Sequence, residues 1–267
     1  MTSLRAIRIL PMIFAALLAG CASNTVEIVS FSPSGETPML ATIEVEFSHD
    51  LAPPDKQQEW TTDEYIRFTP ALKGRFKWTS ARRLMFSPDT PLQPMQSYTA
   101  EVRDAVLFSS ELSGDFDTQE FHTPAFDVKK ADLFCTHIPR KYYTVTMQAN
   151  VQFTYPVQPD RLRGHLEVLR DGEPVKDVQI LSEQPSDVIA ISIGEAQQKD
   201  KKQVLTLRIR EGLASVLGRE PLADTREFTL ELPPITQLAV LGVAAGYDGE
   251  TGWIEVATTQ TIDDARA

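Results

Sequence analysis

The sequence predicts an all-β protein made of tandem antiparallel β-sandwiches. Apolar and polar residues alternate with a period of two through 42–48, 145–154 and 205–210. This alternation is typical of a strand that buries one face and leaves the other in water. Proline and glycine turns break the chain between such runs, and no helical period of useful length follows the first twenty residues.

Strand-like runs follow one another closely between residues 26 and 124. They are 26–33, 42–48, 65–70, 75–80, 83–88, 97–103 and 119–123. About seven short strands in roughly 100 residues, separated by frequent turns, are typical of an immunoglobulin-like (Ig-like) sandwich. Trp78 and Phe86 lie in two of these runs, and we expect both rings in the core of the sandwich.

A second set of strands, over 125–234, looks like a copy of the first. The matching segments are Val45–Ser48 with Val151–Thr154, Thr99–Arg103 with Thr206–Arg210, and Glu120-Phe121 with Glu227-Phe228. Matches at nearly one offset indicate an internal duplication. We therefore predict one sandwich over 26–124 and another over 125–234.

The last part of the chain starts a third copy. Ile254–Ala257 follows the same pattern as Val151–Thr154, and Pro233-Pro234 precedes it as a linker would. Residues 235–267 are too few to bury a core alone. We predict that they form the incomplete start of a third β domain.

The N-terminus predicts export and lipidation. Arg5 and Arg8 precede a short apolar run, which is typical of a signal peptide over 1–20. The run ends in Leu18-Ala19-Gly20-Cys21, which resembles the lipobox of bacterial lipoproteins. This resemblance implies that Cys21 carries the lipid, that 21–25 form a tether, and that Ala22 directs the protein to the periplasmic face of the outer membrane.

The charge of the chain excludes one class of partner. The net charge is −11, and removal of residues 1–20 leaves 24 basic and 37 acidic residues, or −13. Such a surface repels nucleic acid, so we expect no nucleic-acid role.

Few residues qualify for catalysis or metal binding. Cys135-Thr136-His137 holds the one pairing of cysteine and histidine. A nucleophile also needs an orienting group, and zinc needs three or four ligands, so we assign no catalytic, metal or cofactor residue. Asp115 and Asp117 lie in an acidic loop with oxygen ligands suited to calcium, but the loop lacks a fixed ligand spacing, which favours solvation. Asp263-Asp264 is expected on the surface.

Two aromatic residues leave two interpretations open. Trp60 and Tyr65 flank the acidic stretch Thr61–Glu64 and could form an exposed platform for a glycan. The favoured alternative is that these aromatic side chains fold back on the core.

Several motifs resemble the N-terminal domains of bacterial alpha-2-macroglobulins. In the first domain they are Phe31–Glu36, Val45–Ser48, Ile66–Pro70, Trp78, Leu84–Pro88, Pro91-Leu92 and Tyr98, and in the second Phe153–Val157 and Leu166–Val168. The opening of the third copy, Ile254–Asp264, is similar too. The resemblance implies macroglobulin-type Ig-like sandwiches and a family that traps proteases after cleavage of a bait region. The family's thioester motif Cys-Gly-Glu-Gln is absent here, and no bait segment can be assigned.

We therefore expect a non-enzymatic, lipid-anchored stalk of a protein that inhibits endopeptidases. The resemblance implies that host or competitor proteases are partners of the full-length protein, and that the membrane is contacted through Cys21. The alternative is a structural or adhesive Ig-like surface lipoprotein that binds glycan or protein. A long continuation of the gene with a thioester motif would favour the inhibitor.

The lipobox interpretation predicts that Cys21→Ser releases the protein from membranes, because the lipid has no other attachment point. Globomycin, which blocks lipoprotein signal peptidase, should cause the uncleaved precursor of the unaltered protein to accumulate. Fractionation and immunoblotting measure both effects. Continued membrane attachment of the Cys21→Ser variant would refute the assignment.

Overall fold

The computed structural model describes residues 24–138, 141 and 143–259. The predicted signal peptide, Cys21 and Asp263-Asp264 lie outside the described residues. Among the described residues nearly all regular structure is β, and the single α-helix is α1 (Pro159–His165). No described helix has the length and apolar character needed to cross a membrane.

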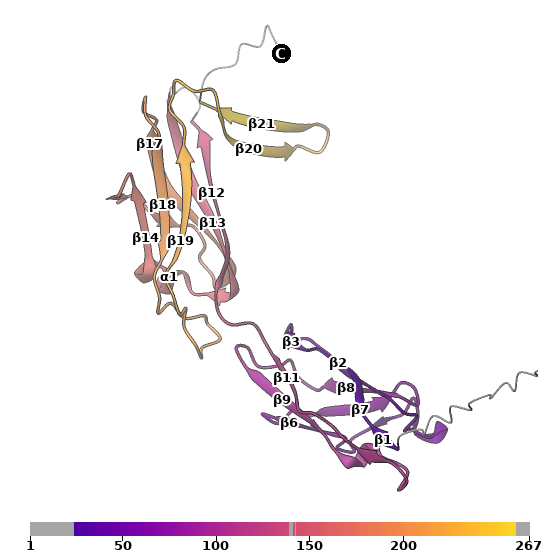
Figure 1. The fold of residues 1–267 in the computed structure, drawn as a ribbon. Coiled ribbons are helices and arrows are strands. Elements are labelled where there is room, and N and C mark those ends of the chain that lie inside the picture. The colour runs from indigo at the N-terminus through magenta and orange to yellow at the C-terminus, as the bar shows by residue number, and fades with distance from the viewer. Residues whose placement is uncertain (1–23, 139–140, 142, 260–267) are drawn as a thin grey trace, which may run out of the picture. The chain divides into compact units, whose positions relative to one another are not determined.

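The first set of strands forms two main sheets (Figure 1). The first sheet has the order β2-β4-β8-β7-β5, and the second has the order β3-β11-β9-β6. Their bounds are β2 Ile28–Ser32, β3 Gly35–Glu36, β4 Ile43–Phe47, β5 Trp60–Thr61, β6 Ile66–Thr69, β7 Gly74–Trp78, β8 Arg83–Pro88, β9 Ser97–Val102 and β11 Gln119–His122. A parallel pair, β1 (Thr25–Val26) with β10 (Ser113–Gly114), and two 3-10 turns, η1 (Pro54–Lys56) and η2 (Asp104–Val106), complete this set.

Aromatic rings fill the core beside β4, β7 and β8. Trp78 and Phe86 are both buried, as predicted. The Trp78 ring lies 5.7 Å from that of Phe47, and the rings of Phe76 and Phe86 are 4.7 Å apart. Tilted and edge-on contacts at such distances are the arrangements that aromatic pairs prefer.

The second set also forms two sheets, ordered β12-β13-β17-β16 and β15-β14-β18-β19. Their bounds are β12 Val128–His137, β13 Thr144–Val157, β14 Leu166–Arg170, β15 Glu173–Pro174, β16 Gln179–Ile180, β17 Ser186–Gln197, β18 Gln203–Ile209 and β19 Arg226–Leu232. Along β13 and β18 every second residue is buried, which is the alternation read from the sequence. The buried aliphatic side chains of both sheets form one core.

The two sets share one strand order. The order β2-β4-β8-β7 in the first set corresponds to β12-β13-β17-β16 in the second, and β6-β9-β11 corresponds to β14-β18-β19. The backbone N–H of Arg103 donates a hydrogen bond to the carbonyl of Tyr65, just before β6. The backbone N–H of Arg210 donates an equivalent bond to the carbonyl of His165, at the position before β14, and both bonds are 2.9 Å long. Sequence matches and strand order therefore support the predicted duplication.

Phe47 and Phe153 occupy equivalent positions in detail. Phe47 pairs with Ile28, and Phe153 pairs with Val128; in both cases the register shifts immediately afterwards. In the first copy the hydroxyl of Ser48 accepts a hydrogen bond from the backbone N–H of Glu27. In the second copy the hydroxyl of Thr154 accepts one from the backbone N–H of Asp127. Each pair of strands thus has the same irregularity beside its buried phenylalanine and the same hydroxyl contact next to it.

Contacts divide the chain into two compact units that do not follow the predicted boundary. One unit combines the described residues up to Ser32 with Thr42–Ser87 and Ala100–Gln119; the other combines Pro33–Ala41, Pro88–Thr99 and the residues from Glu120 onward. The domain limits 26–124 and 125–234 therefore remain a prediction drawn from the repeat.

The final described segment is the two-stranded hairpin β20 (Val240–Tyr247) and β21 (Gly252–Thr258) (Figure 1). Many of its apolar side chains are exposed, namely Val240, Val243, Tyr247, Trp253, Ile254 and Val256. The hairpin touches β12 by backbone, since a Cβ added to Gly242 would lie 2.4 Å from the carbonyl oxygen of Cys135. Only two strands of the predicted third domain are therefore present among the described residues of this segment.

Because Phe47 and Phe153 hold equivalent buried positions, Phe47→Ala and Phe153→Ala should each lower the free energy of unfolding by about 3–5 kcal/mol. Val29→Ala is the matched control, since Val29 lies on β2 with an exposed side chain. Its cost should stay within about 0.5 kcal/mol. Urea unfolding measures all three, and a loss below 1 kcal/mol in either phenylalanine variant would contradict the equivalence.

Candidate functional site

Cys135 is placed where a nucleophile does not function. Its side chain is 1% exposed and belongs to the core of the second set of strands. Burial raises the pKa of the Cys135 thiol to about 12, against a small opposing effect of Arg170. Since the thiolate is the reactive form, the thiol is inert at neutral pH. His137 lies two residues further along β12, where its backbone pairs with Val145.

A cavity of about 100 Å³ lies beside this part of β12. Its lining comes from β12 and from the hairpin, and Glu255 is the one charged residue among the described residues that line it. A lone carboxylate offers neither a nucleophile with its base nor a set of metal ligands.

The acidic loop that contains Asp115 and Asp117 has a structural role. Both aspartates are exposed, while the N–H of Asp115 donates to the carbonyl of Val26. Phe116, between them, packs its ring 5.9 Å from that of Phe47. Among the residues that the structure describes, no three His, Cys, Asp or Glu side chains gather in a group that could hold a metal. The packing of Phe116 was not predicted, although an aromatic residue between two aspartates is visible in the sequence.

Trp60 and Tyr65 have different environments. Tyr65 is 4% exposed, and its ring packs edge-on against Phe76 and Trp78; burial also raises the pKa of its hydroxyl. Trp60 is 43% exposed on the edge strand β5. The favoured expectation, that both rings fold back on the core, is therefore correct for Tyr65 and wrong for Trp60. The two rings do not form a joint platform.

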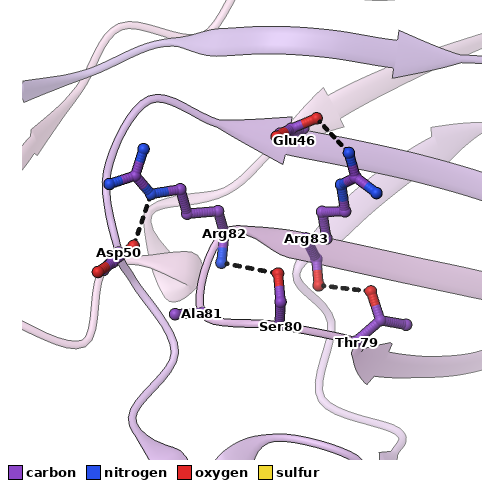
Figure 2. A pocket seen from close by; sticks show the side chains of 7 residues that line it. All are labelled: Glu46, Asp50, Thr79, Ser80, Ala81, Arg82 and Arg83. Atoms are coloured by element: carbon purple, nitrogen blue, oxygen red, sulfur yellow. Dashed lines mark hydrogen bonds and ion pairs between the residues drawn. The ribbon is translucent and has the colours of Figure 1, made fainter.

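Figure 2 shows a polar depression around the turn that joins β7 to β8. Arg82 Nε donates to Asp50 Oδ1 at 2.5 Å, and Arg83 Nη2 donates to Glu46 Oε2 at 3.0 Å. Thr79, Ser80 and Ala81 complete the lining. Each arginine already has a carboxylate partner, so this depression has no unpaired charge to offer a ligand. Exposed pairs of this kind contribute about 0.2–1 kcal/mol each.

A further ion pair lies just after the predicted junction near Thr123–Phe126. Arg226 on β19 makes two hydrogen bonds of 2.8 Å to the Asp127 carboxylate, and these hold the pKa of Asp127 below its usual range. The hydroxyl of Tyr155 donates to the carbonyl of Pro124 at 2.8 Å. These hydrogen bonds therefore connect residues 124–128 to β13 and β19.

Comparison with known proteins gives one distant relative by sequence. No family model matches the chain. An alpha-2-macroglobulin homolog of Yersinia pestis is 22% identical over 217 residues, which cover 79% of this chain. The chain spans 11% of the length of that relative. This likeness supports the alpha-2-macroglobulin family at a distance, in agreement with the resemblance carried by the motifs.

Solved structures give weaker matches. An L,D-transpeptidase from Mycobacterium tuberculosis is 15% identical, with 62% of this chain and 74% of that chain covered and a TM-score of 0.26. An L,D-transpeptidase from Mycobacterium smegmatis is 13% identical, and the match covers 62% of this chain and 75% of that chain with a TM-score of 0.26. Similarity at this level supports no argument about function.

The raised pKa predicts that native protein carrying Cys21→Ser does not react with a thiol reagent such as DTNB at pH 8, whereas denatured protein releases one thiol. An unfolded thiol has a pKa near 9, and the folded one about 12. The folded state therefore binds the proton more tightly than the unfolded state does. The contribution of this difference to the free energy of unfolding is fully present below pH 9 and is lost as pH rises toward 12. Cys135→Ala should remove that pH dependence. Fast labelling of the native protein would restore Cys135 as a candidate nucleophile.

Proposed function

We propose that this chain is the membrane-anchored, N-terminal stalk of an alpha-2-macroglobulin-like protein that takes part in endopeptidase inhibition. The observation that carries the proposal is the 22% identity over 217 residues to the Yersinia pestis alpha-2-macroglobulin homolog. The duplicated Ig-like strand order supports it, because domains of one type in series are what the motif resemblance implies.

The chemistry of the chain favours a supporting role over a trapping role. The sequence has no Cys-Gly-Glu-Gln motif, and Cys135 is buried with a pKa of about 12. The arginines of the polar depression are paired with carboxylates. In this proposal the chain is not an enzyme, and the bait and the covalent trap belong to other parts of the full-length protein.

The C-terminal hairpin fits the same proposal. Exposed side chains such as Val243, Trp253 and Ile254 lie on a two-stranded sheet, which is marginally stable by itself in water. An apolar patch of this kind marks a surface that another element covers. We assign 235–267 to the start of a third domain, whose remaining strands would cover it.

The proposed location follows from the first residues of the chain. Residues 1–20 would direct export, Cys21 would carry the lipid, and 21–25 would tether the first domain to the periplasmic face of the outer membrane. The partners are then that membrane and, through the full-length protein, host or competitor proteases. A net charge of −11 does not favour binding of nucleic acid, which is typically bound by a basic surface.

The stalk assignment predicts that purified residues 22–267, mixed in equimolar amounts with trypsin, subtilisin or thermolysin, leave cleavage of a large protein substrate unchanged. The product of the complete gene should inhibit the same proteases under the same conditions. Residual proteolysis of a fluorescent casein measures both. Stoichiometric inhibition by residues 22–267 would overturn the stalk assignment, and failure of the complete product to inhibit would overturn endopeptidase inhibition.

A further inference from the structure

An exposed tryptophan lies beside two positive side chains at the edge of the sheet β2-β4-β8-β7-β5. We call Trp60, Arg75 and Lys77 the cation–tryptophan face. The Arg75 guanidinium lies 5.3 Å from the centroid of the indole, and the Lys77 ammonium lies 5.6 Å from it. Both distances are within the range of a cation–π contact.

The strand register explains why these side chains share one surface. Trp60 pairs with Lys77, and Thr61 pairs with Phe76. Phe76 is buried in the aromatic core, so its neighbours Arg75 and Lys77 point to the opposite face of β7. Cross-strand partners lie on the same side of a sheet, and this places the Trp60 ring on that outer face.

The charges on this face are not neutralised by carboxylates. Among the ion pairs of the described residues, neither Arg75 nor Lys77 has an acidic partner. By contrast, Arg82 in the turn before β8 is paired with Asp50, and Arg83 on β8 is paired with Glu46 (Figure 2). In a chain of net charge −11, this face therefore places two cations without carboxylate partners next to a half-exposed indole.

The cation–π contacts leave part of this surface in solvent, since Trp60 remains 43% exposed. At exposed sites such contacts contribute about 0.5–1 kcal/mol each. They also leave the N–H donors of Arg75 and Lys77 free to bind oxygen acceptors, which are the strong partners of both groups.

We propose that the cation–tryptophan face binds an acidic glycan. A sugar ring presents an apolar C–H surface that packs on the indole, and a carboxylate or phosphate on the same or the next sugar takes charge-assisted hydrogen bonds from Arg75 and Lys77. The strongly acidic chain repels a polyanion as dense as nucleic acid, whereas a glycan whose acidic groups are a full sugar apart meets the two cations with less repulsion. This site is independent of protease inhibition and goes beyond it.

The test uses the whole chain with an oligogalacturonate, which carries one carboxylate per sugar, and measures binding by isothermal titration calorimetry. A neutral dextran of the same size tests the need for charge, and polyglutamate tests the need for a sugar ring. We expect saturable binding of the oligogalacturonate. The affinity for dextran and the affinity for polyglutamate should each be weaker than that by about ten-fold or more.

Variants locate the site. Trp60→Ala and the double variant Arg75→Ala/Lys77→Ala should each weaken oligogalacturonate binding by about ten-fold or more, and Trp60→Phe should retain most of the affinity. Arg82→Ala is the matched control, because Arg82 is an exposed cation near the same sheet whose charge is already paired with Asp50. Its affinity should stay within about two-fold of the unaltered chain. Thermal unfolding confirms that each variant is folded.

Three results would overturn the proposal. One is the lack of saturable binding of oligogalacturonate to the unaltered chain. Another is equal binding of polyglutamate, which would show a charge effect without sugar recognition. The third is undiminished binding after both Trp60→Ala and Arg75→Ala/Lys77→Ala, since the glycan would then bind elsewhere.

Discussion

Each of the two sets of strands depends on one buried phenylalanine at an irregular strand pair. Phe47 and Phe153 are both 1% exposed, and each pairs with an aliphatic residue just where the register shifts. A slip of one residue would turn the ring to the solvent side and expose every buried neighbour with it. The hydroxyls of Ser48 and Thr154 accept from the backbone N–H of the residue just before the partner strand and so oppose such a slip.

The same construction explains why the thiol of Cys135 is unreactive. Side chains on the inner faces are apolar and closely packed, so the thiol of Cys135 is desolvated and protonated at neutral pH. On the outer faces many charges are satisfied locally, as with Arg226 and Asp127. The cation–tryptophan face at the edge strand β5 differs, because its two cations contact the Trp60 ring and have no carboxylate partner among the ion pairs of the described residues.

The hairpin β20–β21 differs from the rest of the described chain. The sandwich strands bury their apolar residues against a second sheet, whereas the hairpin leaves Val243, Tyr247 and Ile254 largely in solvent. Its backbone approaches β12 closely at Gly242, which has no side chain. A surface like this lowers stability unless another element covers it, which agrees with its proposed place at the start of a third domain.

The sequence by itself determined the all-β fold class, the main strands of residues 26–124 and the matching segments of the repeat. Alternation with a period of two placed β8 at 83–88 and predicted that Trp78 and Phe86 are buried, because a strand alternates its faces residue by residue. It could not separate Tyr65 from Trp60, since two aromatic residues in neighbouring segments carry the same local pattern. Only the tertiary structure decided between them: Tyr65 precedes β6 and faces the aromatic core, whereas Trp60 lies on an edge strand with its ring on the outer face beside Arg75 and Lys77. That choice depends on which residues pair across strands, and such pairing joins parts of the chain that no local pattern connects.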